Sequence, residues 1–91
     1  MTIQVSNFGE VLISRPAGKE AFLAARAYAF PKDGIGTEKI SLDFSGVKVL
    51  SPSWADEFIS GIKATYTNDI AYLNTENPSV KQTLKTLNGA A

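Results

Sequence analysis

Residues 40–58, ISLDFSGVKVLSPSWADEF, decide the fold that the sequence predicts. Apolar and polar residues alternate from Ile40 to Phe44, which is typical of a strand with one buried face. Ser45-Gly46 marks a turn, after which the apolar signal continues to Leu50. Ser51-Pro52 then supplies a candidate N-cap and a proline at the first helical position. We therefore expect a central strand that leads into a helix.

The residues before this stretch predict a hairpin and a helix. Thr2 to Ser6 alternates polar and apolar residues, Asn7 to Glu10 has turn chemistry, and Val11 to Ile13 is a short apolar run. These patterns indicate an antiparallel β-hairpin. From Pro16 to Phe30, alanines and aromatic residues recur at helical spacing until Pro31, so a first helix is expected there.

The residues after this stretch predict one more strand and helix. Asn68-Asp69 marks a turn before the short strand Ile70 to Leu73, and Val80, Leu84 and Leu87 are spaced for one helical face. The element order is ββαβαβα. It indicates a single α/β domain over residues 1–91, with a mixed, mostly parallel four-stranded sheet, an antiparallel first edge strand and helices on one face.

The composition excludes several classes of function. Nine Lys and Arg balance nine Asp and Glu, and their scattered positions offer no basic patch for nucleic acid. The chain has no histidine and no cysteine, which removes imidazole metal sites and Ser-His-Asp or Cys-His catalysis. No stretch approaches the roughly 20 apolar residues of a membrane span, and the first residues lack the features of a signal peptide. We expect a cytoplasmic protein that does not associate with membranes.

Polar residues follow three of the predicted strands. In a parallel α/β arrangement the carboxyl ends of the strands and the amino ends of the helices share one edge, where ligands usually bind. This rule selects Ser14-Arg15, Ser51 to Glu57, and Asn74 to Asn77. The candidate site therefore lies at this edge.

Two serines at the start of the second helix have structural and functional interpretations. Either Ser51 or Ser53 is suited to cap the helix, and Ser53 with Asp56 three residues later fits a capping box. Alternatively, a hydroxyl at this helix terminus is a phosphate acceptor, because free N–H groups and the helix dipole favour negative charge there. Both serines are candidate phosphoacceptors.

Charged residues near these serines also have two interpretations. Asp56 and Glu57 are favoured near a helix N-terminus whatever their function, and as neighbours they point about 100° apart, which excludes a facing carboxylate pair. Arg15 is placed to pair with Asp56 or Glu57, or to hold an anion of a partner. Asp43 is expected to face outward or to accept a bond from a loop, and no second acid is spaced to form a metal site with it.

Trp54 and Asn74 complete the set of candidates. Trp54 is expected to anchor the second helix in the core unless its ring is exposed, in which case it is a candidate hot spot for a protein partner. Asn74 and Asn77 have the chemistry of turn and cap residues, and Asn74 is also a candidate contact for a ligand or partner.

The stretch 40–58 resembles the STAS domains, the fold of bacterial anti-sigma-factor antagonists, and is most similar to an uncharacterised STAS-like bacterial family. Asp43-Phe44, Val47 and Trp54-Ala55-Asp56-Glu57 match the family pattern, in which a strand ends in Asp-Phe-x-x-Val and an aromatic residue with Ala-Asp-Glu follows a short loop. Ser14-Arg15 and Asn74 also fit the family. The resemblance therefore spans nearly the whole chain.

This resemblance implies a non-catalytic regulatory module without a cofactor, which binds a protein partner such as a GHKL-type ATPase or serine kinase. Antagonists carry a phosphorylated serine in an Asp-Ser-x-Gly motif at the start of the second helix. Here Pro52 occupies the phosphoserine place, so the phosphorylation does not transfer residue for residue, and Ser53 is the neighbouring candidate. The sequence leaves the oligomeric state open.

Two other functions are considered. A sensor of a nucleotide or another anion would hold its ligand between Arg15, the Ser51 loop and Asn74. An enzyme is the least favoured hypothesis, because the usual catalytic groups and a phosphate-binding loop are absent from the sequence.

Overall fold

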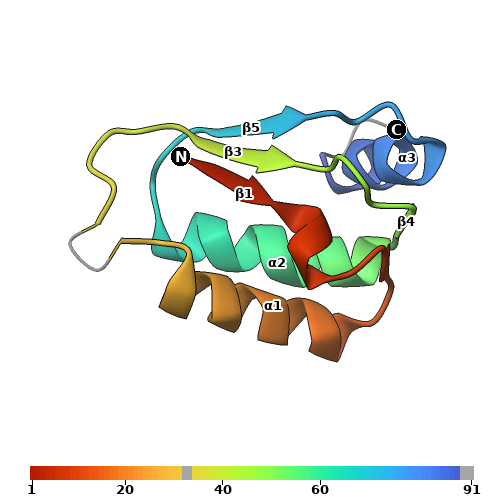
Figure 1. The fold of residues 1–91 in the computed structure, drawn as a ribbon, viewed down its shortest axis with the longest axis horizontal. Coiled ribbons are helices and arrows are strands. Elements are labelled where there is room, and N and C mark those ends of the chain that lie inside the picture. The colour runs from red at the N-terminus through yellow and green to blue at the C-terminus, as the bar shows by residue number, and fades with distance from the viewer. Residues whose placement is uncertain (32–33, 89–91) are drawn as a thin grey trace.

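The computed structural model describes residues 1–31 and 34–88. Short strands and three α-helices follow one another along this part of the chain (Figure 1). In order, they are β1 (Thr2–Gln4), the 3-10 helix η1 (Val5–Phe8), β2 (Val11–Leu12), α1 (Arg15–Tyr28), β3 (Ile40–Asp43), β4 (Val49–Leu50), α2 (Pro52–Thr65), β5 (Ile70–Leu73) and α3 (Pro78–Leu87).

Every strand pairing in the described part of the chain is parallel. One sheet has the order β1-β3-β5, in which Leu42 lies opposite Ile3 on one side and Tyr72 on the other. A second, two-stranded sheet pairs β2 with β4. The prediction of a small α/β domain with a mostly parallel sheet is confirmed.

The predicted hairpin at the N-terminus is wrong. β1 pairs with β3 and β2 pairs with β4, so the two N-terminal strands belong to different sheets. Between them the chain forms η1 instead of a tight turn, and Gly9, with a φ of 133°, donates its N–H to the Ser6 carbonyl at 3.0 Å. The 3-10 helix buries Val5 and redirects the chain, which no two-residue hairpin turn would do.

The predicted four-stranded sheet is also divided. The apolar run that indicated one central strand forms β3 and β4, each in its own sheet. Gly46 has a φ of 88° in the turn between them, a backbone conformation that favours glycine. The turn therefore carries the chain from one sheet to the other.

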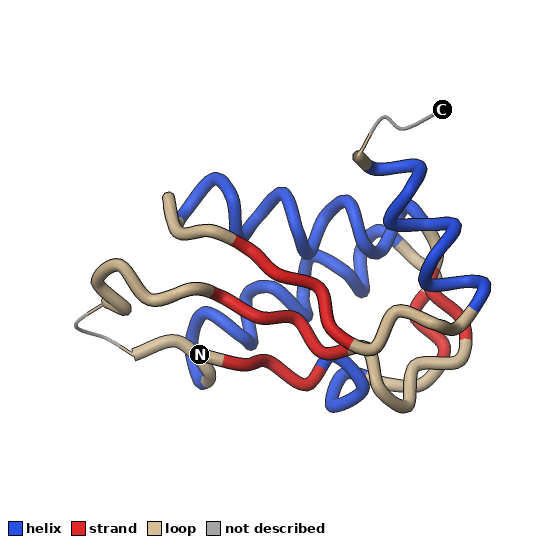
Figure 2. The backbone as a smooth tube through the Cα atoms, turned by 90° about the horizontal axis from the view of Figure 1, so that it is seen from above, coloured by secondary structure: helices blue, strands red, loops and turns tan. Residues whose placement is uncertain are grey.

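Two helices cover one face of the three-stranded sheet. In Figure 1, α2 lies below β1, β3 and β5, and α1 lies beside α2 on the same side. Seen from above in Figure 2, the strands cross in front of both helices and α3 stands at one end. The prediction of helices on one face is therefore confirmed for α1 and α2, whereas α3 packs against α2 and β4.

Helix α2 supplies the centre of the core. Trp54, Phe58 and Ile62 are buried along one side of this helix, and the Trp54 and Phe58 rings are stacked with centroids 4.9 Å apart. Phe8 of η1 adds a third ring, 5.4 Å from that of Phe58. Burying this apolar area is the main favourable term for folding.

Helix α3 closes the outer edge of β4. Leu50 donates its N–H to the Ser79 hydroxyl at 2.9 Å, and its carbonyl accepts hydrogen bonds from the hydroxyls of Ser79 and Thr83. These two hydroxyls, one turn apart on α3, take the place of a neighbouring strand. No helix within residues 1–31 and 34–88 combines the length and apolar character that a bilayer crossing demands.

Candidate functional site

The amino ends of the three helices lie at the same end of the molecule as the carboxyl ends of β3 and β5 (Figure 1). The caps are Ser14 for α1, Ser51 for α2 and Asn77 for α3, and each accepts a hydrogen bond from a backbone N–H of its helix. A proline follows each cap within the first two helical positions. The candidate residues are therefore brought to one end of the fold, as the sequence predicted.

Ser51, and not Ser53, caps α2. The Ser51 hydroxyl accepts from the Trp54 N–H at 3.2 Å and donates to the Ile13 carbonyl at 2.6 Å, so it also ties the start of α2 to the end of β2. Ser53 lies inside the helix as its second residue, which makes the predicted capping box with Asp56 wrong. The half-buried Ser53 hydroxyl has no part in capping.

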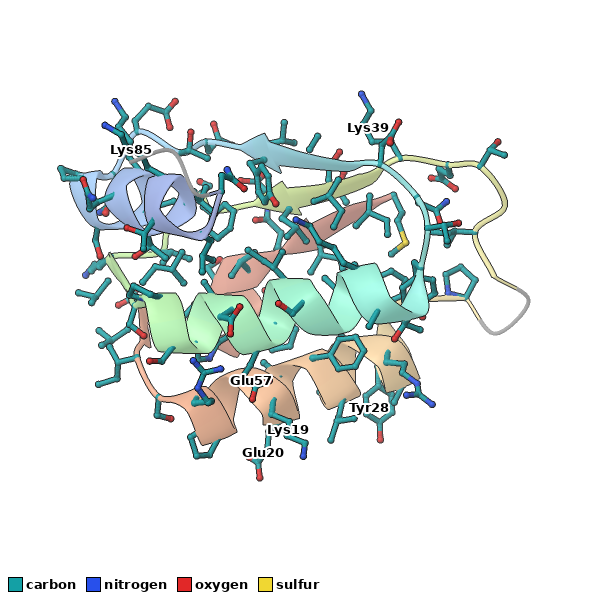
Figure 3. The ribbon with its side chains drawn as sticks, turned by 180° about the vertical axis from the view of Figure 1, so that it is seen from behind. Lys19, Glu20, Tyr28, Lys39, Glu57 and Lys85 are labelled. Carbon is teal, nitrogen blue, oxygen red and sulfur yellow. The ribbon has the colours of Figure 1, made fainter. Side chains whose placement is uncertain are left out.

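Arg15 links the first turn of α1 to the second turn of α2. Its Nη1 lies 2.9 Å from Asp56 Oδ2 and 3.7 Å from Glu57 Oε1, so the expectation that Arg15 pairs with these acids is confirmed. Figure 3 shows Glu57 lying between the two helices. The Ser60 hydroxyl, which the sequence did not single out, donates to Asp56 Oδ1 at 3.1 Å. These four residues form the cross-helix charge cluster.

The cross-helix charge cluster is exposed to solvent. Arg15 and Asp56 are 52% and 46% exposed, so water and salt screen their attraction and the pair adds little to stability. The Arg15 bond lowers the pKa of Asp56, with help from Ser60. In turn, the hydrogen bond to Asp56 raises the pKa of Arg15. At neutral pH the cluster presents one cation and two anions on the surface.

A second polar group joins the ends of β3 and β5. Asn74 Nδ2 donates to Asp43 Oδ1 at 2.8 Å, and the Ser45 N–H donates to the same oxygen at 2.9 Å. Asn74 has a φ of 54°, a left-handed conformation that asparagine tolerates better than most residues. The bond from Asn74, followed by that from Ser45, lowers the pKa of Asp43. Asp43 therefore accepts bonds from the loop, as one of its two predicted alternatives required.

Trp54 anchors α2 in the core, as expected, so its alternative role as an exposed hot spot for a partner is excluded. Its side chain is only 2% exposed, because the first turn of α2 directs it inward against Phe8 and Phe58. The indole therefore belongs to the core and is not available to a partner. Of the predicted candidates near it, Asp56 and Glu57 present their carboxylates outward.

The three residues that were candidates to hold an anion together, Arg15, Ser51 and Asn74, each bond to different partners within the protein. Arg15 bonds to Asp56, Ser51 bonds within the α2 cap and to Ile13, and Asn74 bonds to Asp43. Among the described residues, no group of three His, Cys, Asp or Glu side chains is arranged to hold a metal ion.

One hollow of the surface was not predicted. It has a volume of about 520 Å³ and lies between β2 and α1, with Ala17, Ala21 and Ala24 along its helical wall. The sequence signal was present, because alanines four and three residues apart mark one side of a helix, but it was interpreted only as evidence for the helix itself.

The fold and its site define a small parallel α/β module with a polar, charged surface where α1 and α2 begin. Residues 29–80, more than half of the chain, match the family described as a STAS-like domain of unknown function (DUF4325), and the chain belongs to this family. The matched range runs from the end of α1 through β3, β4, α2 and β5 to the first turn of α3. No curated protein and no solved structure matches the chain.

Proposed function

We propose that this chain is a non-catalytic regulatory module that binds a protein partner with the surface around the cross-helix charge cluster. The observation that carries the proposal is the placement of Arg15, Asp56 and Glu57 side by side near the exposed amino ends of two different helices. Exposed charges of both signs, held by rigid elements, favour electrostatic recognition of a partner. The STAS-like family, whose name links it to regulatory modules of the antagonist type, supports the same class of function.

The partner proposed is a kinase-like ATPase of the GHKL type, with Ser53 as the acceptor of a phosphate. Ser53 is the second residue of α2, where the helix dipole favours a negative group. Asp56 and Glu57 follow at three and four residues, so a phosphate on Ser53 would lie on their side of the helix. It would repel both carboxylates and compete with them for Arg15. Phosphorylation would thereby change the charge of the surface to which the partner binds.

The test begins with capture of partners from the source organism. A recovered ATPase would be purified, and its affinity for the wild type, Arg15→Glu and Asp56→Lys would be measured by calorimetry. We expect each charge reversal to weaken binding at least about tenfold, because it places like charges opposite one another across the interface. The matched controls are Glu76→Lys and Lys81→Glu, two exposed charges beside or on α3. Full affinity of both cluster variants would reject the proposed surface.

The phosphorylation step has its own test. The purified ATPase and ATP would be incubated with the wild type, Ser53→Ala and Ser51→Ala, and the phosphate located by mass spectrometry. Incorporation that Ser53→Ala abolishes and Ser51→Ala retains would support the proposal. Incorporation at Ser51, or none in the presence of an ATPase that binds tightly, would limit the function to binding without this modification.

A further inference from the structure

Strand β2 has one open edge. The Glu10 carbonyl accepts the Val49 N–H at 3.0 Å and the Leu12 carbonyl accepts the Ser51 N–H at 2.9 Å, so these groups face β4. Because backbone groups of successive residues in a strand point to alternate sides, those of Val11 point to the opposite edge. Among residues 1–31 and 34–88, no backbone hydrogen bond from a turn, loop or helix cap reaches the Val11 N–H or carbonyl. The corresponding groups of Leu50, on the far edge of this sheet, are satisfied by α3.

The hollow between β2 and α1 follows this open edge. The three consecutive side chains Val11, Leu12 and Ile13 all line it. Since consecutive side chains of a strand point to opposite faces, a hollow in contact with both residues of β2, Val11 and Leu12, runs along the edge of the strand and not over one face. Val11 and Ile13 are 56% and 57% exposed, so two large apolar side chains lie close together on the surface beside the hollow.

The helical wall of the hollow leaves room for another strand. Ala17, Ala21 and Ala24 lie along one side of α1, and each reaches only one carbon from its backbone. A strand paired with β2 would lie about 4.8 Å from it, above this alanine row, and would extend the β2-β4 sheet across α1. The alanines explain why the space beside β2 is open.

The charge of the hollow is contributed by a single residue. Glu20 is the one ionisable side chain among its lining residues, and Figure 3 shows it projecting from the outer side of α1 together with Lys19 and Tyr28. An occupant that brings a cation to this wall would pair with the carboxylate. This side of α1 lies about 180° around the helix from Arg15, since Arg15 and Ala24 are nine residues apart at 100° each. It is therefore separate from the cross-helix charge cluster.

We propose that β2 is a docking strand for an extended segment of a partner protein, which adds to the open edge in the manner of β-augmentation. The segment alternates apolar residues, which pack over the alanine row, with polar ones, and it carries a Lys or Arg that pairs with Glu20. Backbone hydrogen bonds to Val11 provide the affinity, while the alanine row and Glu20 provide the selectivity. This second surface allows the module to hold one protein at β2 while another contacts the cross-helix charge cluster.

The test is selection from a library of random eight-residue peptides displayed on phage, with the purified chain as bait. We expect enrichment of alternating apolar sequences with one basic residue. The strongest peptide would be synthesised, and its affinity would be measured by fluorescence anisotropy. N-methylation of its alternate backbone amides removes donors and is expected to weaken binding at least about tenfold. Because this change is made in the peptide, it leaves the fold of the chain untouched.

Two pairs of variants locate the peptide. Glu20→Lys is expected to weaken binding of the peptide about tenfold. A peptide with its basic residue replaced by Glu is expected to bind the Glu20→Lys variant with restored affinity, because the pair again has opposite charges. The control Glu76→Lys is expected to have no effect. Ala24→Leu fills the hollow and is expected to abolish binding, whereas Ala27→Leu, exposed but outside the lining, leaves it intact. Failure to enrich any peptide, equal binding to Glu20→Lys or selection of helical peptides would overturn the proposal. A dimer of the chain that excludes the peptide would show that a second copy occupies the edge and would also overturn it.

Discussion

Gly18 of α1 lies directly against the backbone of Trp54 in α2. A Cβ placed on Gly18 would be 2.9 Å from Trp54 Cα and 3.0 Å from its carbonyl carbon, closer than side-chain atoms approach a backbone. The absence of a side chain at this position therefore sets the separation of the two helices. It also sets the reach of Arg15, three residues earlier, toward the acids of α2.

We expect Gly18→Ala to destabilise the chain although alanine is the better helix former. The gain in helix propensity is about 1 kcal/mol. However, the new methyl group would clash with backbone atoms of Trp54, which cannot move aside by changing a side-chain rotamer. Overpacking of this kind costs about 1–3 kcal/mol, and the loss adds to any lengthening of the Arg15 to Asp56 pair. Thermal unfolding followed by circular dichroism measures the effect, with the exposed neighbour Lys19→Ala as control. A higher Tm for Gly18→Ala than for the wild type would show that the helices separate freely.

The two serines of the α2 N-terminus should differ in their effect on stability. Ser51→Ala removes the cap and the bond to the Ile13 carbonyl, and loss of an N-cap costs about 1 kcal/mol, with a range of roughly 0.5–2 kcal/mol. Ser53→Ala, inside the helix, should be neutral or slightly stabilising because alanine has the higher helix propensity. Urea denaturation measures both variants. A larger loss for Ser53→Ala would reverse the assignment of the cap.

The hydrogen bond from the buried Thr83 hydroxyl to the edge of β4 should contribute to the stability of the fold. Thr83 is 4% exposed and donates to the Leu50 carbonyl, so Thr83→Val keeps the shape of the side chain and removes the bond. A buried hydrogen bond contributes about 1 kcal/mol net, and we expect a loss of this size in urea denaturation. Thr86→Val, on the exposed side of α3, is the matched control and should change stability by no more than about 0.5 kcal/mol. Equal effects at both positions would mean that Thr83 has no special part in closing the edge.

Much of this architecture could be predicted from the sequence. The alternation from Ile40 to Phe44 and the Ser51-Pro52 helix start are local signals, and both elements were found where they were expected. The pairing of Arg15 with Asp56 also followed, because parallel topology brings helix starts together. These predictions succeeded because the repeat of apolar residues and the residues that cap a helix are both visible within a few positions of the sequence.

The parts that were not predicted depend on distant residues. Thr2 to Gln4 and Val11-Leu12 carry ordinary strand patterns, but no local signal shows whether the partner of a strand is the next strand or one 38 or 39 residues later. The burial of Trp54 was expected, but its contact with Phe8 of η1 was not, because the two rings are 46 residues apart in the sequence and meet only in the folded chain. The open edge of β2 and its hollow follow from this pairing, so the docking strand could be inferred only from the structure.

The pKa values of Asp43 and Asp56, both lowered in the folded chain, should respond to different substitutions. The pKa of Asp43 is lowered first by Asn74 and that of Asp56 first by Arg15. Asn74→Ala should therefore raise the pKa of Asp43 and leave that of Asp56 unchanged, while Arg15→Gln should do the reverse. Carboxyl titration by nuclear magnetic resonance separates the two sites. A shift of both carboxyls in either variant would show that the two polar groups are coupled.

The same shifts give stability a definite dependence on pH. A carboxyl whose folded pKa lies below its unfolded value of 3.8 stabilises the native state above that pH, and the contribution is lost as the pH falls through the folded pKa. Stability should therefore decrease on acidification below about pH 4. The decrease should be smaller in Asp43→Asn, which keeps an acceptor oxygen for Asn74 but does not titrate. Urea denaturation at a series of acidic pH values measures this slope, and an identical slope in Asp43→Asn would show that the Asn74 bond does not favour the ionised form.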